Sequence, residues 1–335
     1  MRTHILDTKD KAGQKVELFG WVDTRRDMGK IIFVDLRDRS GVVQVVFTPD
    51  NKQMYDLANT VRPEWVLKIS GTVGERPEKM VNKDIETGTV EIQPETLEVL
   101  NEAETPPFAL DTDGKEIGEE NRMKYRYLDL RRKRMQDNMT LRYRVIKHIR
   151  DFLDEKGFLE IETPILSKST PEGSRDFVVP SRLHNGKFYA LPQAPQQYKQ
   201  LLMVAGFEKY FQIARCFRDE DTRGDRQPEF TQLDLEMSFV EKEDVMKINE
   251  ELLISIVKNT MPEKKIQEIP FPRFTYKEAM EKYGTDRLDL REDKDDPNLL
   301  AFAWVIDFPL FEKTDNDGWT FTHNPFSAPK PEFMN

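Results

Sequence analysis

The chain has 335 residues, more than a single hydrophobic core usually supports, so at least two domains are expected. Apolar residues make up 38% of it and charged residues 33%, a composition that excludes a disordered chain. The formal net charge of −10 argues against a protein that coats nucleic acid without regard to sequence.

Roughly the first 100 residues contain five stretches that alternate apolar and polar side chains, as β-strands do. We predict strands at 15–23, 31–37, 42–47, 65–74 and 89–100, with a helix at 52–59. Five strands with a helix after the third are typical of the OB-fold, an all-β barrel that commonly binds single-stranded nucleic acid. We therefore expect an OB-fold domain over residues 1–102.

Residues 102–120 are rich in acidic residues, proline and glycine and show no sustained apolar period. We expect a linker or hinge over residues 103–138. A basic segment begins inside it, because 11 Lys or Arg but only two acidic residues lie between Arg122 and Arg150. Composition alone favours a solvated helix face over a nucleic-acid contact for this segment.

The remainder, residues 139–335, is predicted to be an α+β domain. Helices are expected at 139–156, 196–205 and 243–261, and strands at 158–163, 210–217, 230–240 and 301–311. Residues 262–297 look polar and irregular. We therefore expect a second domain built around an antiparallel pair of strands.

The predicted strand at 230–240 alternates strictly between apolar and polar side chains. Leu233, Leu235, Met237 and Phe239 should face one way, and Gln232, Asp234, Glu236 and Ser238 the other. The polar face continues into a charged loop at 218–229. This favours a functional site over a simple exposed edge.

Several short motifs resemble those of the class II aminoacyl-tRNA synthetases. Residues 158–164 (FLEIETP) resemble motif 1, and 217–220 (FRDE) with 230–232 (FTQ) resemble motif 2. Together with 170–177 (TPEGSRDF), 193–196 (QAPQ) and 226–230 (RQPEF), they make the chain resemble the bacterial aspartyl-tRNA synthetases along its length. The resemblance implies a ligase that activates L-aspartate with ATP as aspartyl-adenylate and transfers it to the 3′ end of tRNA(Asp).

The resemblance also assigns roles to residues at the ATP site. A carboxylate must meet the α-phosphate of ATP, and the fixed charge and planar fork of an arginine suit that encounter. Arg218 would be the catalytic residue that contacts both anions. ATP would be held by Arg218, Asp219, Glu220, Gln227 and Phe230, with the ring of Phe230 beneath the adenine.

The aspartate pocket is implied in the same way. Gln196 and Lys199 lie three residues apart on one helix face, so both can point towards one pocket. Lys199 would meet the side-chain carboxylate, Glu172 and Asp234 would take the α-ammonium group, and Arg218 and the loop residue His323 would complete the pocket. This chain has Asn324 where the family often has a second histidine.

Anticodon recognition would belong to the barrel. Phe33 can stack on an unpaired base, although packing in the core remains an equal alternative because Ile31 and Ile32 are both apolar. Base and phosphate contacts are expected from Arg26, Gln44, Arg76 and Glu91. Met28 stands where members that charge two tRNAs tend to have histidine, which favours tRNA(Asp) alone.

Two features depart from the family pattern. The domain inserted after motif 2 is absent or nearly so, and motif 3, with its arginine and the acidic magnesium ligands, is not found before Asn335. We therefore expect Mg²⁺ to accompany ATP without metal ligands from this chain, and this polypeptide alone to activate aspartate poorly. A catalytically incomplete tRNA-binding fragment and a sister enzyme for asparagine or lysine remain alternatives.

The only cysteine is Cys216, which excludes an internal disulfide and fits a reducing cytoplasm. We find no signal peptide and no apolar stretch long enough to span a bilayer. The expected partners are tRNA(Asp), L-aspartate, ATP and a second copy of the chain, and neither a membrane nor DNA.

Overall fold

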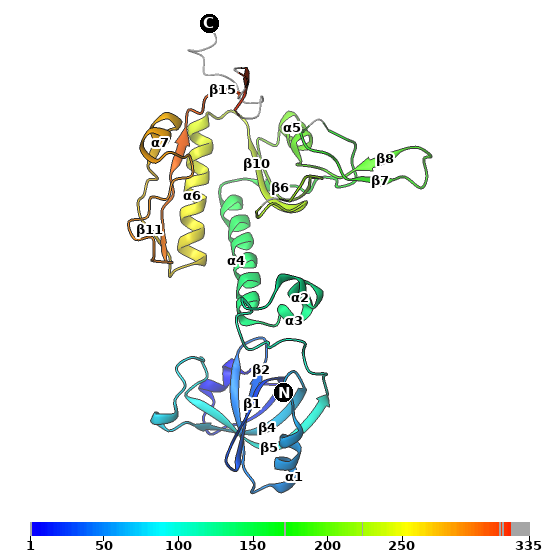
Figure 1. Ribbon diagram of the computed structural model, residues 1–335, viewed down its shortest axis with the longest axis vertical. Helices are drawn as coiled ribbons and strands as arrows, with labels where there is room; N and C mark the ends of the chain where they lie inside the picture. Colours follow the sequence, from blue (N-terminus) through cyan, green and yellow to red (C-terminus); the bar gives the residue numbers. More distant parts are fainter. Residues whose placement is uncertain (1, 171, 223, 315, 317, 323–335) are drawn as a thin grey trace. The chain divides into compact units, whose positions relative to one another are not determined.

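The computed structural model describes residues 2–170, 172–222, 224–314, 316 and 318–322. The chain divides into two compact units, Met1–Met139 and Thr140–Asn335 (Figure 1). Each unit has its own cluster of buried apolar side chains.

The first unit is a five-stranded closed barrel. Its strands follow the order β1-β2-β3-β5-β4, and their bounds are β1 (Lys15–Met28), β2 (Ile31–Arg37), β3 (Val42–Phe47), β4 (Val66–Glu75) and β5 (Val90–Asn101). The short helices are η1 (Leu6–Asp10), α1 (Lys52–Thr60) and η2 (Glu78–Met80). All neighbouring strands are antiparallel except β3 and β5. The predicted OB-fold barrel, with a helix after the third strand, is confirmed.

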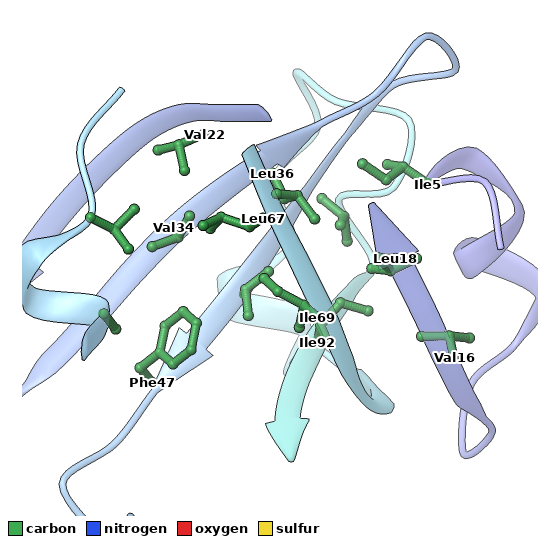
Figure 2. Close-up of a cluster of buried hydrophobic side chains, with 14 of the residues drawn as sticks. Ile5, Val16, Leu18, Val22, Val34, Leu36, Phe47, Leu67, Ile69 and Ile92 are labelled. Carbon is green, nitrogen blue, oxygen red and sulfur yellow. The ribbon is translucent and has the colours of Figure 1, made fainter. Parts of the chain in front are cut away.

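Strict alternation along the strands fills the barrel. On β2, Ile32, Val34 and Leu36 are buried in one cluster with inward residues of the other strands. Figure 2 shows Val34 and Leu36 of this cluster with Leu18 and Ile69. Side chains at the intervening positions of β2 must therefore lie on the outer face of the barrel. Phe33 is one of them, so it is half-exposed and does not belong to the core.

After the barrel, the first unit continues with α2 (Glu119–Lys124), α3 (Arg126–Asp129) and the start of α4 (Lys133–Glu155). Here Asp129 is fully buried and accepts hydrogen bonds from Arg122, Arg126 and Arg132 at 3.4, 2.5 and 3.0 Å. Burial alone would raise the pKa of Asp129, but the three guanidinium groups outweigh it and lower the pKa. Part of the basic segment therefore surrounds a buried carboxylate rather than forming a solvated face.

The second unit is built on a hairpin of β9 (Lys209–Phe217) and β10 (Glu229–Met237), with β6 (Leu159–Glu160) parallel to β9. One side of the hairpin packs against α4 and α6 (Lys242–Thr260) through Leu153, Phe211 and Leu252. The predicted inward residues Leu233, Leu235 and Met237 join this core. The other side lies beside α5 (Gln196–Val204), which follows the hairpin of β7 (Val178–Pro180) and β8 (Phe188–Ala190) (Figure 1).

Several predicted elements need correction. Phe239 is not a core residue, because β10 ends at Met237 and Phe239, at φ +59°, is 93% exposed. The helix predicted from residue 139 begins at Lys133, where an i,i+4 pair with Asp137 supports its first turns. The strand predicted at 158–163 is limited to Leu159–Glu160.

The prediction of an irregular segment at 262–297 is also wrong. It contains β11 (Lys265–Ile266), β12 (Arg273–Thr275) and α7 (Tyr276–Tyr283). The two strands pair in parallel with β13 (Leu299–Leu300) and β14 (Trp304–Ile306), and β15 (Phe311–Lys313) pairs with β16 (Trp319–Phe321). Within the described ranges, no helix is long and apolar enough to cross a membrane.

Candidate functional site

Lys199 and Asp234 form the centre of a charged site on the polar side of the β9–β10 hairpin. The ammonium of Lys199, on α5, lies 2.7 Å from Asp234 Oδ1 and 3.3 Å from Glu236 Oε2, both on β10. The side chains of Lys199 and Asp234 are only 13% and 10% exposed. Burial would lower the pKa of Lys199, but the hydrogen bond and the charges of the two carboxylates outweigh it and raise the pKa. Lys199 is therefore a fixed cation.

Two carboxylate oxygens near this lysine have no hydrogen-bond donor. Asp234 Oδ2 and Glu172 Oε1 are both buried and accept no hydrogen bond from any described residue. Burial raises the pKa of Glu172, whereas a hydrogen bond with the Thr170 side chain and the charges of Arg218 and Lys199 lower it in part. Buried acceptors of this kind favour a ligand that brings its own donors, as an ammonium group does.

Arg218 extends the site at the end of β9. Its backbone N–H donates to Pro228 O at 2.8 Å, which closes the hairpin, and its Nε donates to Gln193 O at 3.4 Å. The guanidinium lies over the ring of Phe230, 5.0 Å from the ring centroid. The residues predicted for the phosphate and for the adenine ring are thus brought together.

A loop at residues 172–176 is attached to the end of β9. Asp219 N–H donates to Arg175 O at 3.0 Å, and the hydroxyl of Ser174 donates to the Glu220 carboxylate. The buried amide of Gln193 holds the same loop. We did not predict Gln193 as a site residue, although it lies within the QAPQ motif. Its partners are 17 and 19 residues away in the sequence, and no local pattern indicates them.

The other residues predicted for this site are more exposed to solvent, or lie outside the described residues. Gln196 is the half-buried first residue of α5, and Asp219, Glu220 and Gln227 are exposed around the 218–229 loop. His323 lies outside the described residues. The structure therefore pairs Lys199 with Asp234 and Arg218 with Phe230, and the charges of both cations act on Glu172. Asp219 and Glu220 follow Arg218 in the loop.

A small cavity of about 140 Å³ lies beside the site. Glu172 lines it, together with Tyr198 and Leu201 of α5, but Lys199, Arg218 and Asp234 do not. Tyr198 also shares a hydrogen bond with Ser167 Oγ, at 2.6 Å. The cavity therefore opens along a different face of α5 from the charged site.

The six residues predicted for anticodon contacts lie on β1, β2, β3 and β5 of the barrel and on the loop after β4. Arg26 pairs with Phe33 across β1 and β2, and its guanidinium lies 2.8 Å from Asp35 Oδ2. Gln44 donates to Glu91 at 3.3 Å, and Arg76 lies 3.8 Å from the same carboxylate.

These residues are linked electrostatically as well. Burial lowers the pKa of Arg76, the carboxylates of Glu91 and Asp35 raise it in part, and the charge of Arg26 lowers it further. Met28, at the end of β1, is 67% exposed. The half-exposed ring of Phe33 therefore lies on the outer face of the barrel, next to the paired groups of Arg26 and Asp35.

Comparisons with known proteins match the two parts of the chain to two different family models. Residues 16–100 match the family model described as OB-fold nucleic acid binding domain, and residues 118–335 match tRNA synthetases class II (D, K and N). The aspartate–tRNA ligase of Staphylococcus carnosus (strain TM300) is 50% identical over 314 residues, and that of Staphylococcus aureus (strain Newman) is 51% identical over 317 residues. Each alignment covers 93% of this chain and 53% of the relative, so the chain spans about half the length of these curated relatives.

Solved structures show the same architecture. The asparaginyl-tRNA synthetase of Pyrococcus horikoshii, in complex with asparaginyl-adenylate, has a TM-score of 0.73 at 25% identity, covering 87% of this chain and 68% of that one. A putative aspartyl-tRNA synthetase of Leishmania major Friedlin has a TM-score of 0.69 at 27% identity, covering 78% and 53%. With its barrel, its antiparallel hairpin and a family match over residues 118–335, the chain belongs to the class II tRNA synthetases of the D, K and N group.

Proposed function

We propose that the chain serves as an aspartate–tRNA ligase, which activates L-aspartate with ATP and transfers it to tRNA(Asp). The observation that carries this proposal is the buried Lys199, held between Asp234 and Glu236. An ammonium has three donors, and these two carboxylates use two of them. The third would bind the side-chain carboxylate of aspartate, and relatives about 50% identical carry the same activity in their names.

The other groups of the site suit the rest of the reaction. The α-ammonium of aspartate would donate to the unpaired oxygens of Glu172 and Asp234. Its α-carboxylate would then attack the α-phosphorus of ATP, and pyrophosphate would leave. Arg218 would offset the repulsion between these anions, and Phe230, already beneath its guanidinium, would support the adenine.

Mg²⁺ enters the proposal only as the ion that accompanies the ATP phosphates. In the part of the chain that the structure describes, no three His, Cys, Asp or Glu side chains come together as a metal site.

Transfer RNA would bind the outer face of the barrel. The half-exposed ring of Phe33 offers a stacking surface, and Arg26, Gln44, Arg76 and Glu91 offer hydrogen-bonding groups around it. In this proposal residues 1–102 bind the anticodon, 103–138 form a hinge, and 139–335 hold the adenylate.

A homodimer and a cytoplasmic location complete the proposal. Exposed apolar side chains gather near the motif 1 segment, where Leu159, Ile165 and Leu166 are 52%, 44% and 57% exposed. Apolar surface of this kind favours burial against a second copy of the chain. Cytoplasm is where tRNA charging takes place, and the one cysteine, Cys216, is buried and free.

Calorimetric binding of three sulfamoyl adenosine mimics, carrying aspartyl, asparaginyl or lysyl groups, tests the proposal. We expect the aspartyl mimic to bind at least about tenfold more tightly than the asparaginyl mimic, because only a carboxylate pairs with Lys199. The lysyl mimic should not bind, since it would place two cations together. Preference for the asparaginyl or lysyl mimic would favour the sister enzymes, and no binding of any mimic would refute the proposal for this chain.

A further inference from the structure

Gln193 is a nearly fully buried amide side chain near the candidate site. It lies between β8 and α5 and is 1% exposed. Its Oε1 accepts a hydrogen bond from Ser174 N–H at 3.0 Å, and its Nε2 donates to Ser174 O at 3.0 Å and to Asp176 Oδ1. One side chain thus pairs with both backbone groups of Ser174, as a neighbouring strand would.

The backbone of residues 192 and 193 is hydrogen-bonded to the end of β9, which carries Arg218. Gln193 O accepts a hydrogen bond from Arg218 Nε at 3.4 Å, and Pro192 O accepts one from Phe217 N–H at 2.9 Å. Gln193 therefore touches both the 172–176 loop, which carries Glu172, and the strand end that carries Arg218. It is hydrogen-bonded to both of these segments.

We propose that Gln193 is a positioning residue that sets the distance between Glu172 and Arg218, and thereby between the ammonium and phosphate ends of the adenylate. The inference rests on the proposed function for the identity of that ligand. Gln193 would touch neither substrate. The 172–176 loop has no regular secondary structure, so this amide supplies the backbone hydrogen bonds that a strand would otherwise provide.

Loss of the amide should have two separate consequences. Ser174 N–H and O would lose their buried partners, so the loop should open more often. A displacement of about 1 Å can reduce a reaction rate by a factor on the order of 100, so binding of an adenylate mimic should also be sensitive to the loop position.

The isosteric change Gln193→Glu separates positioning from general damage. The introduced carboxylate can still accept from Ser174 N–H, but it cannot donate, and it repels Asp176. Like charges raise the pKa of such a pair, so protonation in mild acid should restore a donor. The charged groups around this amide are Glu172, Arg175 and Asp176 of the loop, Lys199 of α5, and Arg218, Asp219 and Glu220 after β9.

The unmutated chain, two Gln193 variants and one control should each be titrated with the aspartyl sulfamoyl adenosine mimic. The variants are Gln193→Glu and Gln193→Met, and the matched control is Gln200→Met, on the exposed surface of α5. At about pH 8 both Gln193 variants should bind at least about tenfold more weakly than the unmutated chain, and the control should match it. At about pH 6 the ratio between Gln193→Glu and the unmutated chain should approach one, and Gln193→Met should not recover. A ratio that stays constant with pH, or Gln193 variants that bind like the control, would overturn the proposal.

Amide hydrogen exchange without ligand gives a second test that does not depend on the proposed function. Amides of residues 172–176 should exchange at least about tenfold faster in Gln193→Met than in the unmutated chain, while those of β10 stay unchanged. Equal exchange in the 172–176 loop would refute the anchoring role of Gln193. Failure of the unmutated chain to bind the mimic would instead count against the proposed function, and exchange would still decide the role of Gln193.

Discussion

Lys199 illustrates how single charges determine the properties of the site. Its ammonium is enclosed by two carboxylates of β10, one of which, Asp234, is almost entirely buried. Sequence placed Lys199 on the same helix face as Gln196, and the resemblance placed it in an aspartate pocket. Its pairing with Asp234, 35 residues later, depends on the packing of α5 beside β10 and could not be derived from spacing.

Lys199→Met should destabilise the second unit by about 3 kcal/mol, because it leaves buried Asp234 without its cation. The matched control is Lys147→Met, whose partner Asp151 and own side chain are 53% and 60% exposed, and which should leave stability unchanged. Urea denaturation followed by circular dichroism measures both. Equal midpoints for Lys199→Met and the unmutated chain would show that Asp234 does not need Lys199.

Glu172 should make ligand binding depend on pH in mild acid. Burial raises the pKa of its carboxyl group above the ordinary value, so protonation sets in at a higher pH than for an exposed glutamate. Only the carboxylate attracts an ammonium group strongly. Affinity for the aspartyl mimic should therefore fall as pH falls from neutral into mild acid through this raised pKa.

The comparison variant for this effect is Glu172→Gln. It should bind the mimic more weakly at about pH 8 and lose most of the change in affinity that the unmutated chain shows between about pH 8 and mild acid. Calorimetry across that range measures the effect. An unmutated chain whose affinity does not change over this range would show that Glu172 does not meet the ammonium group.

Phe33 and Phe239 show where residue patterns fail. The run from Ile31 to Val34 is apolar throughout, so alternation could not decide which face was inward, and closure of the barrel decides it. Phe239 continues the apolar alternation of β10 but lies two residues beyond its end, where the chain turns with φ +59°. Periodicity predicts a side-chain direction only while the strand continues.

Individual elements were predicted well where their apolar pattern was strong. Four of the five barrel strands, α1, α5, β9, β10 and α6 lie within three residues of prediction, because each has a face that must be buried. The first strand, β1, begins as predicted but continues to Met28, five residues beyond the predicted end. Element α7 was missed because it is short and polar. A sequence signal was nevertheless present, since Thr275 and Glu278 form a reciprocal capping box and Gly284 ends the helix at φ +71°.

That capping box can be tested directly. Thr275→Ala removes the acceptor for Glu278 N–H and should lower the stability of this part of the chain by about 1 kcal/mol. Thr275→Ser keeps a hydroxyl in the same place and should retain most of the stability that Thr275→Ala loses. Thermal unfolding measures both variants, and an equal loss for alanine and serine would show that the hydroxyl does not cap α7.

The molecule as a whole consists of two units with separate cores, as its length predicted. The charged site lies entirely in the second unit and the Phe33 face entirely in the first. Comparisons with known proteins assign a different family model to each. Sequence alone could not give the distances within either surface, because strands and loops far apart in the chain supply the residues.

This separation predicts that the two surfaces can be weakened independently. Phe33→Ala should weaken binding of tRNA(Asp) by about 1–3 kcal/mol through loss of stacking, while affinity for the aspartyl mimic stays unchanged. Fluorescence anisotropy with labelled tRNA(Asp) and calorimetry with the mimic measure the two affinities. Phe47→Leu, in the barrel core, is the control for loss of barrel stability. Unchanged tRNA affinity in Phe33→Ala would remove the ring from the proposed interface.

The central claim is that Glu172, Lys199, Arg218 and Asp234 form one binding site for an aspartyl-adenylate. The most direct test is amide hydrogen exchange of the chain with and without aspartyl sulfamoyl adenosine. We predict that bound mimic slows exchange together in residues 172–176, 196–200, 217–220 and 230–236, and leaves the barrel strand β2 unchanged. Protection confined to one of these segments, or located in the barrel, would contradict the account.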